Sequence, residues 1–359
     1  MKNYVVVLAL THGDQGGSIK HLRAYLAHLN SLRQNNVLVV TNIVGLKADN
    51  LNLVYVPTDL PKIGPYISIM LKLAISFLSN FLSRFVIIDF FNPIFLPSRA
   101  TQVAIVRDLG EMELFKYDAR RMFYRKYIML PLCMRFAKKI ISISETTKRD
   151  ILKHFASAAG KVLVVHHGAD LGDDSEVCAV KSDYFVCLGR LDAVGKNLIN
   201  TLIAFENYCI NGGRCDMLLV GSPWRNTSEI YDLIDNSTVL GKRVTITGFV
   251  SQDVKVKLLR NAKCLVFLSK HEGFGHPILE AHANGCTVLC SDIDVFREIG
   301  GDAAYFVRPD DIEEIERSYF KMEEFTYNDA AMERFRRNVE RFAWEQNFAS
   351  YDRILGINC

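Results

Sequence analysis

The sequence lacks a strong excess of either charge. Its 359 residues contain 43 lysines and arginines against 40 aspartates and glutamates, which leaves a formal net charge of +3. Overall charge therefore gives no indication of nucleic-acid binding, and any charged ligand must be met by local groups. Hydrophobic residues make up 49% of the chain, enough to fill the cores of two domains.

Paired cysteines are also missing. The chain has nine cysteines, an odd number, and no two of them are spaced as Cys-x-x-Cys. Cys187, Cys264 and Cys290 stand in apolar runs, where a thiol serves as a small hydrophobic side chain. This usage favours a reducing cytoplasm. Cys286 and Cys290 have two histidines nearby, but no ligand set with zinc spacing occurs, so we expect no bound metal.

The chain also lacks an uninterrupted apolar run long enough to span a membrane. The most apolar stretch, residues 63–85, is interrupted by Lys72 and by several serines and asparagines, so it falls short of a transmembrane helix. Residues 1–10 look superficially like a short signal peptide, but no small-residue cleavage site follows them. We interpret them as a first buried strand and expect the protein to stay in the cytoplasm.

Apolar runs of strand length alternate with helical patterns along the sequence, which predicts βαβ units and parallel sheets. The expected strands lie near residues 4–10, 36–40, 52–56, 85–89, 103–106, 140–143, 161–166, 184–188, 216–220, 244–249, 264–269, 287–291 and 303–307. Residues 168–180 are acidic, contain glycine and have the composition of a linker. We therefore predict two doubly wound α/β domains, residues 1–172 and 173–340, that face each other across a cleft, with ligands at the carboxyl ends of the strands.

One motif combines two carboxylates with a flexible turn, and its sequence at residues 272–281 is E-G-F-G-H-P-I-L-E-A. The two glycines allow the backbone to turn tightly and to come close to a ligand. Pro277 suits a first helical position, so the amides ahead of it would face an anion. We expect Glu280 in the first helical turn, where it could accept from a vicinal diol such as a ribose, and Glu272 at the other end of the ligand. Taken singly, either glutamate is equally well explained as a solvated charge.

This motif resembles the E-x7-E signature of the family-4 retaining glycosyltransferases, which have the GT-B fold of two Rossmann-like domains. The resemblance implies transfer of a hexose from a nucleotide-diphosphate sugar to a hydroxyl acceptor, with the anomeric configuration kept. Glu272 would contact hydroxyls of the donor sugar. The donor-binding residues that the motif implies are Glu272, Gly273, Phe274, Gly275, Ile278 and Glu280.

Two cations, Arg190 and Lys196, follow the expected strand 184–188 on a loop that contains glycine. A departing diphosphate needs such charges, because negative charge builds on it as the sugar bond breaks. The loop resembles the family's G-R-L-D-x-x-K-N segment, with one extra residue between the two cations. We therefore assign Arg190 and Lys196 to donor binding and, with Glu272, to catalysis, and we expect neither a metal nor a cofactor. An isolated pair of this kind would more often be solvated surface.

Two further segments would contact the donor. Gly16 and Gly17 follow the first strand and open a helix, and they resemble the family's glycine pair that approaches the donor phosphate. Val250 follows the expected strand 244–249, and its backbone groups would read the edge of the base. The sequence leaves the donor open between GDP-linked and UDP-linked sugars.

On the acceptor side, the segment ending in Arg107-Asp108-Leu109 resembles the family's strand that ends in His-Asp-Leu, with arginine where many members carry histidine. Arginine stays charged and cannot act as a general base. Asp108 or Glu111 is then the better base, unless the leaving phosphate itself takes the proton, and His12 is a further candidate near the acceptor. Arg107 and Asp108 could instead form a structural ion pair. Arginine in place of the family's histidine leaves open that the protein binds a nucleotide sugar without catalysing transfer. A sugar-nucleotide epimerase of the same fold is another alternative function.

Two segments, residues 63–85 and 116–139, suggest contact with a membrane surface and therefore a lipid-linked acceptor. The second segment interleaves basic and aromatic side chains, among them Lys126 and Tyr127, and such segments can lie on anionic lipid. We expect Pro131 to break its helix. The alternative is a core-packing helix with a solvated charged face. A polyprenyl-diphosphate-linked glycan at the inner face of the cell membrane, as in the synthesis of surface polysaccharides such as lipopolysaccharide, would suit this segment.

The tail, residues 341–359, resembles the last helices of the same family. The resemblance implies a helix that crosses back onto the first domain. A plain amphipathic terminal helix would have the same sequence pattern.

Overall fold

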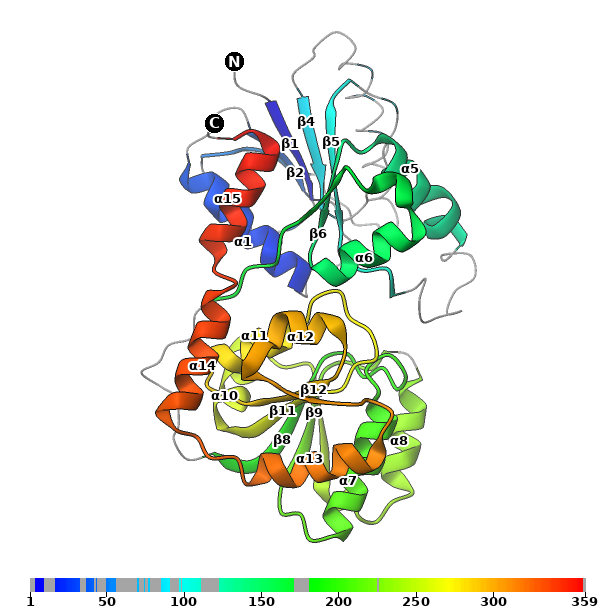
Figure 1. The fold of residues 1–359 in the computed structure, drawn as a ribbon, viewed down its shortest axis with the longest axis vertical. Coiled ribbons are helices and arrows are strands. Elements are labelled where there is room, and N and C mark those ends of the chain that lie inside the picture. Colours follow the sequence, from blue (N-terminus) through cyan, green and yellow to red (C-terminus); the bar gives the residue numbers. More distant parts are fainter. Residues whose placement is uncertain are drawn as a thin grey trace. The chain divides into compact units, whose positions relative to one another are not determined.

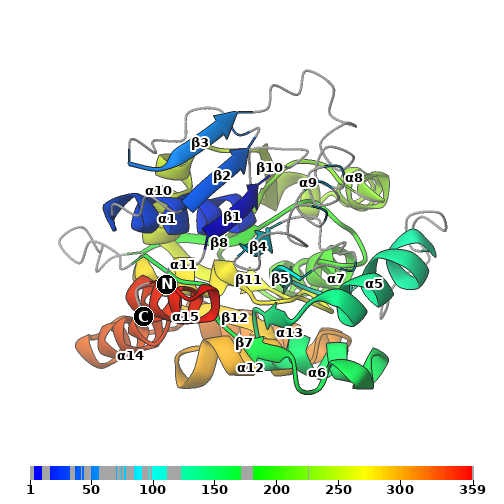
Figure 2. The same ribbon diagram turned by 90° about the horizontal axis from the view of Figure 1, so that it is seen from above.

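The computed structural model describes residues 4–9, 17–32, 37–41, 43, 50–55, 70, 74, 77, 85–90, 97, 99–110, 123–170, 181–224 and 226–357. The chain divides into two compact units (Figure 1), and Figure 2 shows the same ribbon from above. The N-terminal unit consists of Met1–Gly168 and Trp344–Cys359, and the C-terminal unit of Ala169–Ala343. In each unit, helices pack on a parallel sheet.

The sheet of the N-terminal unit has the order β3-β2-β1-β4-β5-β6-β7, and its neighbouring strands are all parallel. Its strands are β1 (Tyr4–Ala9), β2 (Val37–Thr41), β3 (Asn52–Tyr55), β4 (Phe85–Asp89), β5 (Thr101–Val106), β6 (Lys139–Ser142) and β7 (Val162–Val164). The central strands are rich in valine and isoleucine and almost fully buried, as expected when helices cover both faces of a parallel sheet.

The described helices of this unit are α1 (Gly17–Ser31), the π-helical η1 (Arg125–Met129), α5 (Leu130–Phe136), α6 (Glu145–His154), η2 (Ala156–Ala158) and α15 (Trp344–Leu355). The expectation that Pro131 breaks its helix is wrong, because helical structure continues from η1 to Phe136. Pro131 occupies one of the first two positions of α5, and Met129 just before α5 is itself in the right-handed helical conformation, so the chain passes through Pro131 without leaving the helix. Within the described part of the chain, no helix combines the length and apolar character needed to cross a membrane.

The C-terminal helix α15 packs beside α1 within the N-terminal unit (Figure 1). Asp352 of α15 accepts a hydrogen bond from the Tyr25 hydroxyl at 3.2 Å, and its other oxygen lies 2.8 Å from His28 Nε2. The rings of Tyr25 and Tyr351 are 5.0 Å apart, and those of His28 and Phe348 are 4.6 Å apart. Aromatic contacts and the buried carboxylate of Asp352 thus hold α15 against α1.

The C-terminal unit has the sheet order β10-β9-β8-β11-β12-β13, again with parallel neighbours. Its strands are β8 (Ser182–Leu188), β9 (Asp216–Val220), β10 (Val244–Gly248), β11 (Ala262–Phe267), β12 (Val288–Ser291) and β13 (Tyr305–Val307). Its helices are α7 (Leu198–Ile210), α8 (Thr227–Asp235), α9 (Leu240–Arg243), α10 (Gln252–Asn261), α11 (His276–Ala283), α12 (Asp294–Gly300), η4 (Gly301–Ala303), α13 (Ile312–Glu323) and α14 (Asp329–Glu340). Every predicted strand is present within two residues at each end, and the prediction of two doubly wound α/β domains is confirmed.

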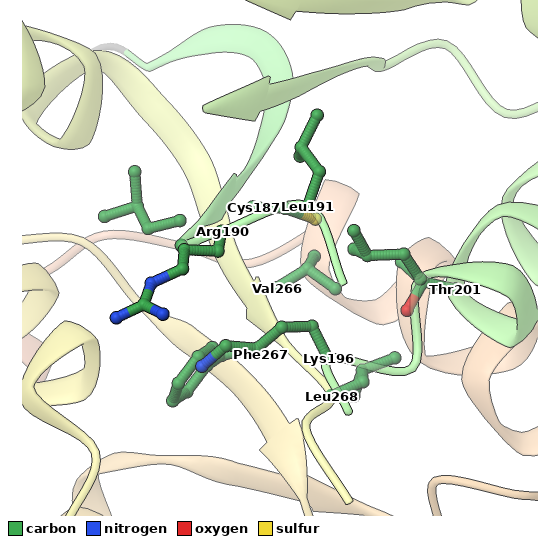
Figure 3. A pocket seen from close by; sticks show the side chains of 11 residues that line it. Cys187, Arg190, Leu191, Lys196, Thr201, Val266, Phe267 and Leu268 are labelled. Atoms are coloured by element: carbon green, nitrogen blue, oxygen red, sulfur yellow. The ribbon is translucent and has the colours of Figure 1, made fainter. Parts of the chain in front are cut away.

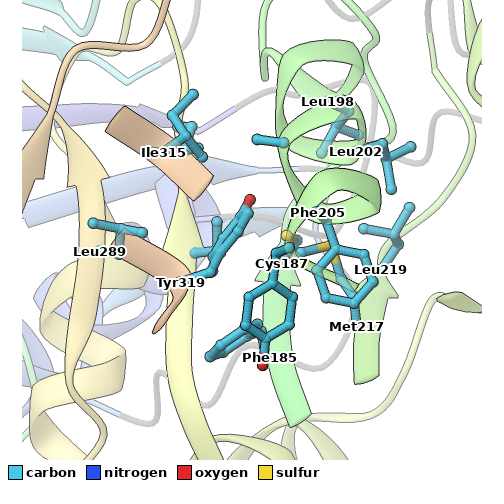
Figure 4. Packing of buried hydrophobic residues seen from close by; sticks show 14 of the residues in the cluster. Phe185, Cys187, Leu198, Leu202, Phe205, Met217, Leu219, Leu289, Ile315 and Tyr319 are labelled. Atoms are coloured by element: carbon cyan, nitrogen blue, oxygen red, sulfur yellow. The ribbon is translucent and has the colours of Figure 1, made fainter. Parts of the chain in front are cut away.

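An aromatic core holds β8 and α7 together in the C-terminal unit (Figure 4). Phe185 of β8 packs on Tyr319 of α13 with 5.3 Å between ring centroids, and Phe205 and Tyr208 of α7 complete the cluster. Cys187, two residues further along β8, belongs to the same core, and burial raises the pKa of its thiol to about 12. The thiol stays protonated at neutral pH and fills space, so the carboxyl end of β8 is held by packing.

Gly168 is the last residue of the first segment of the N-terminal unit, and a β-carbon there would lie 2.0 Å from Cε3 of Trp344. We predict that Gly168→Ala destabilises the protein by about 1–3 kcal/mol, because the half-buried indole of Trp344 would have to move. Gly160→Ala is the matched control, since a β-carbon there has no atom within 4 Å. Urea denaturation of both variants measures the difference, and equal stability would contradict the packing described.

Candidate functional site

A pocket lies at the carboxyl ends of β8 and β11 in the C-terminal unit (Figure 3). The strand order of the sheet reverses between these two neighbours, so their connections leave toward opposite faces and a crevice remains between them. The pocket is lined by Cys187, Leu188, Gly189, Arg190, Leu191, Lys196, Leu198, Thr201, Val266, Phe267 and Leu268. The predicted cations Arg190 and Lys196 both belong to this lining.

Two glycines allow the backbone to bend where β8 ends. Gly189 has a φ of 134° and Gly221, after β9, a φ of 155°, which few residues with a β-carbon adopt. A β-carbon on Gly221 would lie only 1.8 Å from the carbonyl oxygen of Gly189. The Gly189 N–H also donates to the Val220 carbonyl at 3.0 Å. The two strand ends are therefore in close backbone contact just before Arg190.

The loop that follows is folded around Asp192. One oxygen of its carboxylate accepts the N–H groups of Val194 and Gly195, at 3.2 and 2.9 Å. The Lys196 N–H donates to the Asp192 carbonyl at 3.2 Å, and the Lys270 N–H donates to the Gly195 carbonyl at 3.1 Å. These bonds fold the loop back on itself and tie it to the segment after β11. Lys196 therefore reaches the pocket in spite of the extra residue in its loop.

The two cations have different neighbours. Lys196 forms an ion pair with Glu272, and both side chains are about three-quarters buried. Its ammonium group also lies 4.9 Å from the centroid of the Phe267 ring. The guanidinium carbon of Arg190 lies 4.2 Å from the centroid of the Trp224 ring. Arg190 and Lys196 extend toward the same side of the pocket in Figure 3, so the structure brings two positive charges and one carboxylate of the predicted set together.

The motif with two glutamates forms the connection from β11 to α11. Gly275 precedes the helix with a φ of 110°, and the buried side chains of Phe274 and Ile278 anchor the turn. The expectation that Glu280 lies in the first helical turn is wrong, because the helix begins at His276 and has no acidic residue in that turn. Glu280 instead pairs with Lys255 of α10 at 2.7 Å. Its carboxylate is thus held by a neighbouring helix.

For the remaining predicted donor residues, the structure shows only their place along the chain or does not describe them. Val250 follows β10, and the Gly221 N–H donates to the Gly248 carbonyl at 2.9 Å, so Val250 stands at the same edge of the sheet as the pocket. Gly17 is the first residue of α1. Gly16 lies outside the described residues, as do His12 and Glu111 on the acceptor side.

Arg107 and Asp108 directly follow β5 in the N-terminal unit. Burial lowers the pKa of Arg107 to about 10, although Tyr351, Asp108 and Asp89 act in the opposite direction. The guanidinium is therefore still protonated at neutral pH and does not serve as a base. Asp108 accepts the N–H of Gly110 at 3.3 Å.

The sequence alone did not single out Trp224 or Lys255. Trp224 ends a Gly-Ser-Pro-Trp turn directly after β9, and a turn of this kind at a strand end was an available signal. Lys255 gave no signal, because only folding brings α10 against α11. Across the part of the chain that the structure describes, no group of three or more histidine, cysteine, aspartate or glutamate side chains is placed to hold a metal ion.

Sequence comparison places the pocket inside a recognised domain. The family described as "Glycosyl transferases group 1" matches residues 174–341. The serotype-specific mannosyltransferase WbdA of Escherichia coli is 29% identical over 122 residues, which are 34% of this chain and 15% of WbdA. The O-antigen chain mannosyltransferase RfbU of Salmonella typhimurium is 24% identical over 250 residues, 70% of this chain and 68% of RfbU. The chain thus matches only a small part of the length of the first relative.

Comparison of structures extends the likeness to the whole fold. The crystal structure of Anabaena Alr3699/HepE in complex with UDP and glucose superposes with a TM-score of 0.73, covers 99% of both chains and is 16% identical in sequence. At this level of identity the likeness concerns the fold, which is that of the GT-B glycosyltransferases.

We predict that Gly221→Ala lowers the melting temperature, because its β-carbon would collide with the Gly189 carbonyl and its φ is strained for alanine. The cost should be about 1–3 kcal/mol. Gly241→Ala serves as the control, since its β-carbon would have only an ordinary contact at 3.6 Å. Thermal unfolding followed by circular dichroism checks both, and a Gly221→Ala protein as stable as Gly241→Ala would contradict the close approach of β8 and β9.

Proposed function

We propose that the protein is a retaining hexosyltransferase, because residues 174–341 match the group 1 glycosyltransferase family and the chain has the GT-B fold. It moves a sugar from a nucleoside diphosphate to a hydroxyl group of a growing bacterial surface polysaccharide. The observation that carries the proposal is that Arg190 and Lys196 line the pocket between β8 and β11 and that Lys196 is paired with Glu272.

The chemistry follows from these groups. As the bond between the sugar and the diphosphate breaks, negative charge grows on the leaving phosphate, and fixed cations stabilise that state more than the ground state. Arg190 and Lys196 supply this charge, and Glu272, beside Lys196, accepts hydrogen bonds from the sugar hydroxyls. Because the protein's own cations neutralise the diphosphate, we expect turnover to continue in the presence of EDTA.

The donor is a nucleotide sugar linked to GDP or UDP. Two relatives are named as mannosyltransferases, and the Anabaena protein was solved with UDP and glucose, so mannosyl and glucosyl donors of both bases form the first panel. Glu280, held by Lys255, contacts the ribose, and the backbone of Val250 meets the base. Gly16 and Gly17 are assigned to the donor phosphate on the family resemblance alone.

On the acceptor side, Asp108, Glu111 or the leaving phosphate takes the proton of the attacking hydroxyl, and His12 stays a further candidate from the sequence alone. Arg107 acts there as a fixed positive charge, because it stays protonated at neutral pH. The acceptor is a glycan linked to a polyprenyl diphosphate.

The described helical residues 123–129 support contact with a membrane. Phe123 and Tyr127 are 58% and 59% exposed, and their rings lie 5.0 Å apart on one side of the helix. Ile128 is also exposed, and the ammonium group of Lys126 lies 5.4 Å from the Tyr127 ring. Exposed aromatic rings beside a lysine suit the surface of an anionic bilayer. We place the protein at the inner face of the cell membrane.

Lys196→Ala should weaken binding of the nucleoside diphosphate, whereas Glu272→Gln should mainly slow transfer of the sugar. Without Lys196 the diphosphate loses a counter-charge, so affinity for UDP or GDP should fall at least about tenfold. Glu272→Gln should keep that affinity, because the nucleoside diphosphate has no sugar to contact, but should reduce transfer at least about a hundredfold. Calorimetry with UDP and GDP and nucleotide release from the donor panel measure both effects.

The matched control for these variants is Lys270→Ala. It removes a lysine two residues from Glu272 that pairs with Asp310 at 2.6 Å, so transfer should persist. Normal transfer by Lys196→Ala would contradict the proposal. Binding of a donor without nucleotide release, with membrane extract as the acceptor source, would instead identify a catalytically silent binder. Arginine at position 107 keeps this alternative open.

The double variant Phe123→Ser, Tyr127→Ser should bind anionic vesicles more weakly than the wild-type protein, because it removes the exposed aromatic face. Ile210→Ser removes an apolar residue of α7 that is 65% exposed and serves as the control for surface hydrophobicity. Co-sedimentation with vesicles of phosphatidylglycerol and phosphatidylethanolamine measures the difference. Equal binding by the double variant and by Ile210→Ser would refute this contact.

A further inference from the structure

Backbone hydrogen bonds place Trp224 opposite Arg190. The Leu191 N–H donates to the Ser222 carbonyl at 2.9 Å, and the Trp224 N–H donates to the Leu191 carbonyl at 3.1 Å. Leu191 and Pro223 also form a parallel β-bridge. The loops after β8 and β9 therefore continue the pairing of their strands beyond the sheet, and the positions of both side chains follow from this pairing.

The contact between the two side chains is made at the protein surface. Trp224 is 48% exposed, and the guanidinium carbon of Arg190 lies 4.2 Å from the centroid of its ring. At this distance the cation lies over the aromatic face, where the quadrupole of the indole attracts it. An arginine without such a contact would sample many rotamers, and ordering it on binding would reduce affinity.

Because the partner of Arg190 is an indole and not a carboxylate, the site keeps the positive charge of Arg190. Lys196 is paired with Glu272, whereas Arg190 forms no ion pair with a carboxylate among the described residues and lies over an uncharged ring. A carboxylate would hold the guanidinium equally well, but it would compete with the phosphates for the same N–H donors. An indole covers one face of the guanidinium and leaves its donors, which lie in the plane, for a ligand.

We propose that Trp224 is a positioning residue for the donor: it holds the guanidinium of Arg190 in the orientation that binds the second phosphate of a nucleoside diphosphate. The inference rests on the proposed function, since it deepens the role given to Arg190. Trp224 touches neither the sugar nor the reacting atoms in this scheme. Trp224 should therefore affect how much more tightly a nucleoside diphosphate binds than the corresponding monophosphate.

The first test compares nucleoside diphosphates with monophosphates. The ratio of UMP to UDP dissociation constants, and of GMP to GDP, isolates the contribution of the second phosphate. Trp224→Ala should reduce the ratio for the bound nucleotide by about three- to fivefold, and Trp224→Phe should restore part of it. Tyr231→Ala, which removes an exposed aromatic residue of the following helix α8, should keep the wild-type ratio and controls for a general effect on folding.

The second test uses the indole as its own reporter. The chain has two tryptophans, so Trp344→Phe leaves Trp224 as the only one. In that background, UDP or GDP should change the emission of Trp224, because the bound phosphate alters the electric field of the guanidinium at the ring. Arg190→Gln should alter the starting emission and abolish the response to the nucleotide.

The outcomes separate this inference from the function on which it rests. If the wild-type protein binds nucleoside diphosphates and Trp224→Ala keeps the wild-type ratio, the role of Trp224 is refuted while the proposed function stands. The same holds if the emission of Trp224 is insensitive to Arg190→Gln. If the wild-type protein binds neither UDP nor GDP, both proposals are overturned. A reduced ratio with partial rescue by phenylalanine supports the positioning role.

Discussion

The reversal of strand order between β8 and β11 is the constraint on which the candidate site depends. It opens a crevice at the carboxyl edge of the sheet, and the segments that carry Arg190, Lys196 and Glu272 all begin there. The close approach of Gly189 and Gly221 then fixes where the loop with the cations starts. The aromatic core beneath it holds β8 and α7 in place, so the geometry of the site is set by packing before any ligand is considered.

Electrostatic partners organise the charged groups at this edge. Lys196 pairs with Glu272, Glu280 with Lys255, and Lys270 with Asp310. These pairs join the β11–α11 region to neighbouring loops and helices, so each carboxylate of the motif has a defined orientation. A site that arranges its charges before the substrate arrives needs little reorganisation during the reaction. Arg190 differs from this pattern because its neighbour is an aromatic ring.

Much of the fold could be predicted from the sequence. The strands were found because buried parallel strands are continuous apolar runs, and the family resemblance was found because glycines and charged residues follow these runs at fixed distances. The errors concern helix starts and continuity. The first turn of α11 is shifted because Gly275 ends the preceding turn in a left-handed conformation. Pro131 interrupts nothing because it stands at the start of α5, after a π-helical segment.

The sequence by itself determined the two parallel α/β units and the identity of the residues that carry charge at their strand ends, because hydrophobic periodicity and glycine positions are local properties. Only the tertiary structure decided which partner each charge has. Lys255 meets Glu280 and Trp224 meets Arg190 because neighbouring strands and helices bring distant residues together. Contacts between such distant residues depend on how whole helices and strands pack, so the spacing of residues along the chain does not predict them.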